Sequence, residues 1–181
     1  MTRIKVNKTE AACRQINAAV RMLFANEDPV AIYTLSCAAL RILRDIAEKR
    51  HDSLMNQMVE KIIQPNMKKE FWKTLNAPAN FLKHAEKDPD AILDNLEEEA
   101  NDITLLLACI YYKDLGNQLT PEMMAMVVWC MAIHPDLIRD DTPGKAFAEQ
   151  QFSHLKTMSR LEQLSEGQKV LQLARNQPCR L

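Results

Sequence analysis

The chain has 181 residues, of which 47% are hydrophobic, a net charge of −1 at pH 7 and only 3 glycines. The hydrophobic content excludes global disorder, and the near-zero charge excludes a strong overall attraction to nucleic acid or anionic lipid. Sheet proteins need many tight turns, which favour glycine, so the low glycine count indicates helices. We therefore expect an all-α fold, a compact bundle of six to eight helices with no sheet.

Prolines that follow a capping side chain mark helix starts, because proline is tolerated at the first helical position. Four such pairs occur, namely Asp28-Pro29, Asp88-Pro89, Thr120-Pro121 and Thr142-Pro143. Together with apolar spacing they predict helices over about 9–25, 29–50, 52–63, 89–115, 121–133 and 145–164, with another after Ser165. Between residues 64 and 88, Pro65 and Pro78 predict short helices and loops.

The apolar pattern also orders these helices. The second half of 89–115 is apolar nearly all round and is predicted to be the central buried helix. The methionines of 121–133 are interpreted as core, and Ser165 with Gln168 has capping-box spacing. We interpret residues 1–140 as a helical bundle domain and 141–181 as a C-terminal helical appendage packed on the same domain.

The five cysteines are spaced too widely for a zinc or redox pair, since none lies within four residues of another. They are expected to pack as small hydrophobes, with no metal site and no cofactor. The N-terminal residues lack the apolar stretch of a signal peptide, and the longest apolar run is about half a membrane span. A cytoplasmic location without a membrane partner is expected.

The predicted second helix carries a stripe of residues apart from its main apolar face: Tyr33, Cys37, Leu40, Arg44 and His51. Arg44 and His51 lie two turns apart and can converge on one anion, with Arg44 binding phosphate and His51 acting as acid or base. The alternative is structural. Arg44 then pairs with a nearby acid, and His51 stabilises the negative end of the helix.

A second group lies just before the Asp88-Pro89 pair. Asn80, Lys83 and His84 share one face if this segment is helical, and an amide, an ammonium and an imidazole together suit a phosphate or carboxylate. The alternative is a helix end with an extended Lys83 and a structural His84. In contrast, the acidic run at Glu97–Glu99 with Asp102 is interpreted as a solvated face. His134 and His154 have no identifiable partner.

We combine these groups into one hypothesis. Asn80, Lys83 and His84 face Arg44 and Tyr33 across a groove, where they bind the phosphate of a nucleotide or RNA. In a catalytic version, His84 or His51 takes the proton from a ribose hydroxyl, which cleaves RNA without a metal. The competing hypothesis is a non-enzymatic helical module that binds a partner protein.

The number of apolar stripes on the second helix bears on assembly. It carries two stripes, and a single core contact buries only one of them. We therefore expect a homodimer.

The string from Ala79 to Asp90, ANFLKHAEKDPD, resembles a signature of uncharacterised bacterial all-helical proteins, which reads roughly A-N-F-[FL]-K-H-A-x-x-D-P-D. The resemblance covers about Lys8 to Leu96 and implies an all-helical fold. Members often have His at the position of Tyr33. A looser similarity, carried by Arg44 and His51 with six residues between them, is to HEPN domains. That similarity implies a metal-independent ribonuclease or a nucleotide-binding component of a toxin system.

Overall fold

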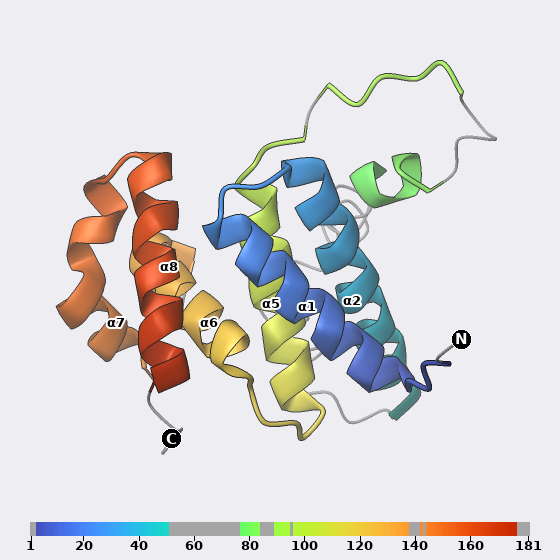
Figure 1. Cartoon of the computed structure of the whole chain (residues 1–181), viewed down its shortest axis with the longest axis horizontal. Helices are drawn as coiled ribbons and strands as arrows, with labels where there is room; N and C mark the ends of the chain where they lie inside the picture. The colour runs from blue at the N-terminus through green and yellow to red at the C-terminus, as the bar shows by residue number, and fades with distance from the viewer. Residues whose placement is uncertain are drawn as a thin grey trace.

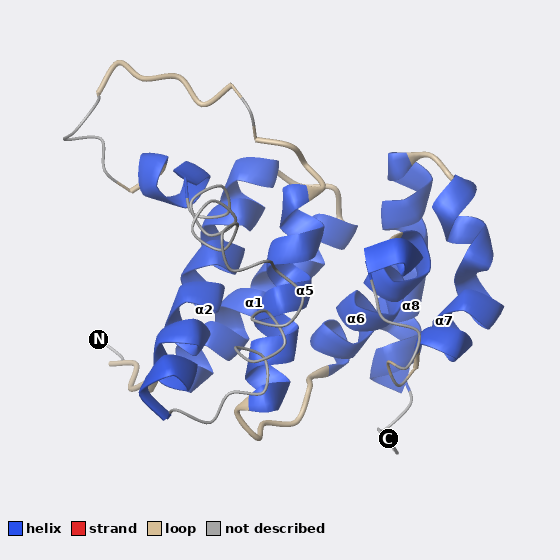
Figure 2. Ribbon diagram, turned by 180° about the vertical axis from the view of Figure 1, so that it is seen from behind, coloured by secondary structure: helices blue, strands red, loops and turns tan. Residues whose placement is uncertain are grey.

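A computed structural model describes residues 3–50, 77–83, 89–94, 96–137, 142 and 144–176. All regular structure in these residues is helical, and none of them lies in a β-strand, so the predicted all-α bundle of six to eight helices is confirmed (Figures 1 and 2). The α-helices are α1 (Lys8–Phe24), α2 (Pro29–Arg50), α5 (Ala100–Asp114), α6 (Pro121–Ile133), α7 (Lys145–Phe152) and α8 (Arg160–Asn176). Two 3₁₀ helices cover Pro135–Leu137 and Ser153–Thr157, and residues 77–81 form a short helical turn.

The helices form two groups that lie side by side. α2 packs against α1 and α5, whereas α7 and α8 pack against α6 (Figure 1). The groups are joined because α6 contacts α1 and α5, and α8 also contacts α1. One continuous core therefore runs through both groups. The division into a 1–140 domain and a 141–181 appendage stays a prediction.

The core centres on large side chains from several helices. Trp129 of α6 is fully buried, and the ring of Phe24 meets it edge to face with centroids 5.3 Å apart. Met123 and Met126 are also fully buried, which agrees with the interpretation of the α6 methionines as core. No helix in the described ranges combines the length and apolar character needed to span a membrane.

Both apolar stripes of α2 are covered within the chain. α2 lies against α1 and α5, and Tyr33 and Cys37 of its second stripe lie against Ala79 in the turn 77–81. The observation that led us to expect a homodimer is therefore accounted for by a single chain. The oligomeric state itself stays a prediction.

Local capping explains why several boundaries were predictable. Asp28 Oδ1 accepts the Ala31 N–H at 2.9 Å at the start of α2, and Thr120 Oγ1 accepts the Met123 N–H at 3.2 Å at the start of α6. Both helices have the predicted bounds. At α1 the cap is Asn7, so the helix begins at Lys8, one residue before the predicted start.

The Asp88-Pro89 prediction is wrong. The structure describes 89–94 without helix, and α5 begins only at Ala100. Ile92, in the middle of the predicted first half, is 85% exposed. A helix in water depends on burying its apolar face, and this stretch has no neighbour among the described residues that buries Ile92.

The prediction for the C-terminal helices is also wrong in its boundary. α7 ends at Phe152, and α8 begins at Arg160 rather than after Ser165. The capping box is formed by Ser159 and Glu162. Glu162 Oε2 accepts hydrogen bonds from the Ser159 N–H at 2.9 Å and from its hydroxyl at 2.6 Å. The predicted helix 52–63 lies outside the described residues.

Candidate functional site

The segment 77–83, which forms one side of the predicted groove, packs on α2. Tyr33 and Cys37 of α2 and Ala79 form a small buried cluster, with Leu82 against it. Figure 1 shows this segment in green beside α2. The structure therefore packs this segment on α2 beside Tyr33, and the contact between them is apolar.

The polar residues of the segment lie outside this cluster. Asn80 and Lys83 are exposed. Burial raises the pKa of the Cys37 thiol to about 11, while the hydrogen bond with Tyr33 and the positive charge of Lys83 oppose that rise. The ammonium of Lys83 is thus close enough to α2 to act on Cys37.

Tyr33 belongs to the apolar cluster and not to a polar groove. Its side chain is 1% exposed, and burial with Cys37 beside it raises the pKa of its hydroxyl. A phenol held neutral in this way is a poor general base. Its role as a ligand residue stays a prediction, and its buried position gives it a clear structural one.

Arg44 lies further along the same face of α2, about 16 Å from Tyr33 along the axis at 1.5 Å per residue. Its side chain is 15% exposed, and its Nε lies 3.6 Å from the Glu48 carboxylate. Its positive charge also affects the hydroxyl of Tyr111 on α5. Burial raises the pKa of Tyr111 to about 12, and Arg44 opposes that rise. Arg44 therefore lies at the contact of α2 with α5, paired with an acid as the structural alternative predicts.

The two predicted catalytic histidines, His51 and His84, lie outside the described residues. Their roles as acid or base stay predictions. Of the predicted site residues, the structure therefore describes Tyr33, which is buried, Arg44, which pairs with Glu48, and Asn80 and Lys83, which are exposed.

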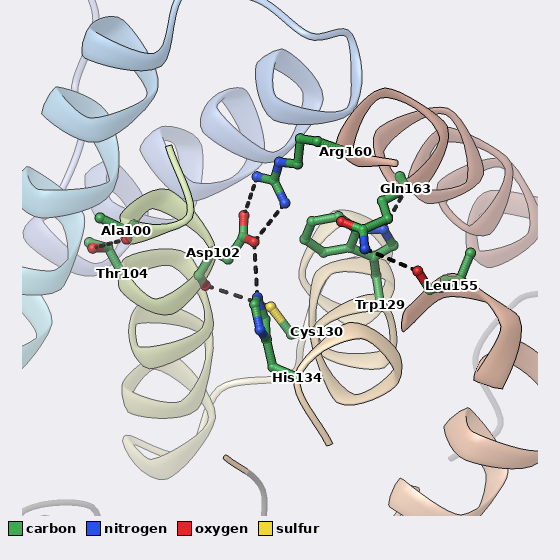
Figure 3. Close-up of polar contacts among 9 residues, drawn as sticks. All are labelled: Ala100, Asp102, Thr104, Trp129, Cys130, His134, Leu155, Arg160 and Gln163. Atoms are coloured by element: carbon green, nitrogen blue, oxygen red, sulfur yellow. Dashed lines mark hydrogen bonds and ion pairs between the residues drawn. The ribbon is translucent and has the colours of Figure 1, made fainter. Parts of the chain in front are cut away.

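A second polar centre was missed by the sequence analysis. Asp102 of α5 is completely buried, so its interpretation as part of a solvated face is wrong. Arg160 of α8 donates two hydrogen bonds to its carboxylate, at 2.7 and 2.8 Å, and His134 Nε2 lies 3.1 Å from Oδ2 (Figure 3). We call Asp102, His134 and Arg160 the Asp102 cluster. It links α5, α8 and the end of α6.

Aromatic and backbone contacts hold Arg160 in place. Its guanidinium carbon lies 5.3 Å from the centroid of the Trp129 ring, in the geometry of a cation–π contact. The Trp129 indole N–H donates to the Gln163 carbonyl at 2.7 Å, one turn along α8 (Figure 3). Burial alone would lower the pKa of Arg160, yet Asp102 raises it overall, so the guanidinium stays charged.

The Asp102 cluster is built for structure more than for chemistry. Asp102 has no access to solvent, and burial raises the pKa of the adjacent Cys130 thiol well above its ordinary value. A protonated, enclosed thiol is not a nucleophile. In the described parts of the chain, no three His, Cys, Asp or Glu residues are grouped so that they could hold a metal ion.

A partial signal for this cluster existed in the sequence. Asp102 precedes Leu105, Leu106 and Cys109 by three, four and seven residues, and all three are buried. A carboxylate on a buried helix face requires a cationic partner. That partner, Arg160, lies 58 residues later, and no local pattern identifies it.

A pocket of about 280 Å³ adjoins the cluster, between the end of α1 and the first turns of α2, α5 and α8. The residues that line it are Leu23, Asn26, Glu27, Asp28, Pro29, Ile32, Glu98, Asn101, Arg160 and Leu164. No local sequence pattern reveals this pocket, because its walls come from four separate helices.

Comparison with known proteins leaves the function to be argued from this geometry. No protein-family model, no curated protein and no solved structure matches the chain. The resemblances to the bacterial all-helical signature and to HEPN domains therefore stay predictions.

Proposed function

We propose that this chain binds a phosphate-bearing ligand, a nucleotide or RNA, on the surface that the segment 77–83 forms with α2. The observation that carries the proposal is the packing of Ala79 and Leu82 on Tyr33 and Cys37. This contact fixes the segment on the same face of α2 that carries Arg44.

The charged and polar side chains on this surface favour the binding of an anion. Lys83 is exposed, and its positive charge opposes the rise in the Cys37 pKa that burial causes. Asn80 is exposed on the same short turn and supplies amide donors for a phosphate, sugar or base. Arg44 pairs with Glu48, whose side chain is 59% exposed. Because the Arg44 side chain is only 15% exposed, a phosphate reaches it only by displacing Glu48 from this pair.

The proposal has a catalytic version. In it, His51 or His84 takes the proton from a ribose 2′-hydroxyl, and the positive charges of Arg44 and Lys83 stabilise the charge that develops on the phosphate. The HEPN resemblance favours this version. The binding proposal does not depend on it.

Binding of a labelled single-stranded RNA and of AMP, measured at about 50 and 200 mM salt, tests the proposal. We expect Lys83→Gln to weaken binding and to reduce the slope of log K against log salt by about 0.7, the contribution of one contact to a single strand. Lys113→Gln, an exposed lysine on α5, is the matched control and should leave both unchanged. Absence of binding at the lower salt, or equal effects of the two variants, contradicts the proposal.

A second candidate function is protein association, which large exposed apolar side chains on α7 and α8 favour. Phe147, Leu161 and Leu173 are each more than half exposed. A second copy of this chain is the partner that the dimer prediction names. Light scattering should then give about twice 20.7 kDa, and the double variant Phe147→Ser, Leu161→Ser should give the single-chain mass. A single-chain mass for the unaltered protein at micromolar concentration excludes this candidate.

A further inference from the structure

The stretch between residues 89 and 99 has the sequence of a helix but not the structure of one. It follows the capping pair Asp88-Pro89, and its isoleucine and leucine side chains have helical spacing. Its described residues 89–94 and 96–99 contain no helix, and 89–94 arches away from the bundle (Figures 1 and 2). We call residues 89–94 and 96–99 the acidic segment, because they include five acidic residues and no basic one.

Helix geometry would gather the apolar side chains of the acidic segment on one side. At about 100° per residue, Ile92, Leu93 and Leu96 fall within an arc of roughly 100°. Glu97 and Glu99 border this arc, one on each side. If α5 is extended backwards through the segment, the result is therefore an amphipathic helix whose apolar stripe lies between two carboxylates.

Two features of the chain oppose that helix. Ile92, in the centre of the segment, is 85% exposed, so the described part of the fold does not bury the apolar stripe. Asp90, Asp94 and Glu98 follow at four-residue spacing, and like charges at this spacing repel each other on a helix. Short helices are marginal in water unless an apolar face is buried. What the acidic segment lacks is a surface to fold on, since its sequence already favours a helix.

The charge of the acidic segment indicates which kind of partner provides that surface. Nucleic acid and anionic lipid are themselves negative and repel a segment that has no basic residue. A protein groove with apolar walls and with lysine or arginine at its rims complements both the apolar stripe and the carboxylates beside it. Leu96 is half-buried against the cluster of Tyr33 and Cys37, so the segment is anchored to the fold at the end that leads into α5.

We propose that the acidic segment is a docking element that folds into a helix, continuous with α5, in a basic apolar groove of a partner protein. Binding buries Ile92 and Leu93, and cations at the rims of the groove pair with Glu97 and Glu99. Because the segment is ordered only on binding, part of the interaction energy is spent on folding it, which makes the contact reversible. The inference does not rest on phosphate binding, which uses the basic and amide side chains of other segments.

A synthetic amphipathic helix of leucine and lysine is the probe, and its leucine–glutamate counterpart is the control. Each is titrated into the isotopically labelled full chain, and the Cα chemical shifts of residues 89–94 and 96–99 report helix formation. The leucine–lysine peptide should bind saturably and move these shifts to helical values. Its binding should be weaker at about 200 mM salt than at about 50 mM. The leucine–glutamate peptide should not bind.

Two exposed isoleucines provide a matched pair of variants. Ile92→Ser removes the centre of the apolar stripe and should weaken binding roughly tenfold or more, the effect of losing one buried aliphatic side chain. Ile4→Ser changes an isoleucine that is 76% exposed near the N-terminus and should leave binding unchanged. Since both side chains are exposed, neither substitution disturbs the core.

The carboxylates are tested in the same way. Glu97→Gln combined with Glu99→Gln should weaken binding and reduce its dependence on salt, because the pairs with the rim cations are lost. Glu27→Gln, at an exposed glutamate outside the acidic segment, should change neither.

Four outcomes overturn the inference. They are the absence of saturable binding by the leucine–lysine peptide, binding that leaves residues 89–94 without helical shifts, equal binding of the leucine–glutamate peptide, and equal weakening by Ile92→Ser and Ile4→Ser.

Discussion

The contact between Gly167 and Phe24 offers a direct test of how α8 is attached to the rest of the fold. Gly167 lies inside α8, where alanine is intrinsically more favourable than glycine by about 1 kcal/mol. In this structure the Phe24 ring occupies the space that a side chain would need. A Cβ at Gly167 would lie far inside van der Waals contact of Cδ1 and Cε1 of Phe24 and 3.1 Å from Cζ.

The size of the stability loss depends on how little the Phe24 ring can move. Phe24 is 3% exposed and its ring lies edge to face against the fully buried Trp129 ring at 5.3 Å, so it is enclosed and cannot swing out into solvent. Overpacking of this kind costs about 1–3 kcal/mol, which outweighs the helix propensity gained. We expect Gly167→Ala to lower the free energy of unfolding by about 1–2 kcal/mol. That loss corresponds to a fall in Tm of roughly 2–8 °C for a chain of this length.

Chemical and thermal denaturation followed by circular dichroism measure the effect. Ser165→Ala, at an exposed position of the same helix, is the control and should be neutral or slightly stabilising. In a Phe24→Leu background, Gly167→Ala should cost less, because the ring edge is gone. If Gly167→Ala instead stabilises the protein by about 1 kcal/mol in both backgrounds, the packing of α8 on Phe24 is refuted.

Three further predictions concern charge and capping. Arg160→Met leaves the Asp102 carboxylate buried without its main partner and should lower the free energy of unfolding, measured in urea, by about 3–5 kcal/mol. The loss should be smaller when Asp102→Asn is added, and an unchanged loss contradicts the pairing. Burial alone would raise the pKa of Glu122, but its hydrogen bond from Arg175 and the nearby positive charges lower it overall. Its contribution is therefore fully present above its unfolded pKa of about 4.3 and is lost as pH falls through the lower folded value. Glu122→Gln should flatten stability against pH below about pH 5, and an unchanged acid limb argues against this. Thr120→Ala removes the cap of α6 and should lower the free energy of unfolding, measured in urea, by about 1 kcal/mol. Thr120→Ser keeps the hydroxyl and should retain most of that stability, so equal losses in the two variants contradict the capping role.

Where a helix boundary depends on adjacent residues, the sequence determined it. Asp28 and Thr120 cap the helices that begin at the following proline, and α2 and α6 have the bounds that these local pairs predict. The same signal at Asp88-Pro89 did not produce a helix at 89–94, because a short helix also needs a surface on which to bury its apolar side chains. Capping is local, whereas burial is decided by the rest of the fold.

The same distinction holds for the candidate site. The sequence placed Asn80 and Lys83 on a segment near α2, and the structure packs that segment on α2. It did not reveal that Tyr33 is enclosed in an apolar cluster, since a tyrosine on a mixed stripe looks the same whether or not another segment covers it.

Tertiary structure alone decided the Asp102 cluster and the pocket beside it. The acidic run from Glu97 to Asp102 looks uniform in sequence, yet Glu98 is exposed at the pocket while Asp102 is fully buried. Helix periodicity turns Asp102 toward the core, but its charge is tolerated only because Arg160 reaches it from α8. Pairing between residues far apart in the chain depends on how helices pack, and no local spacing encodes that.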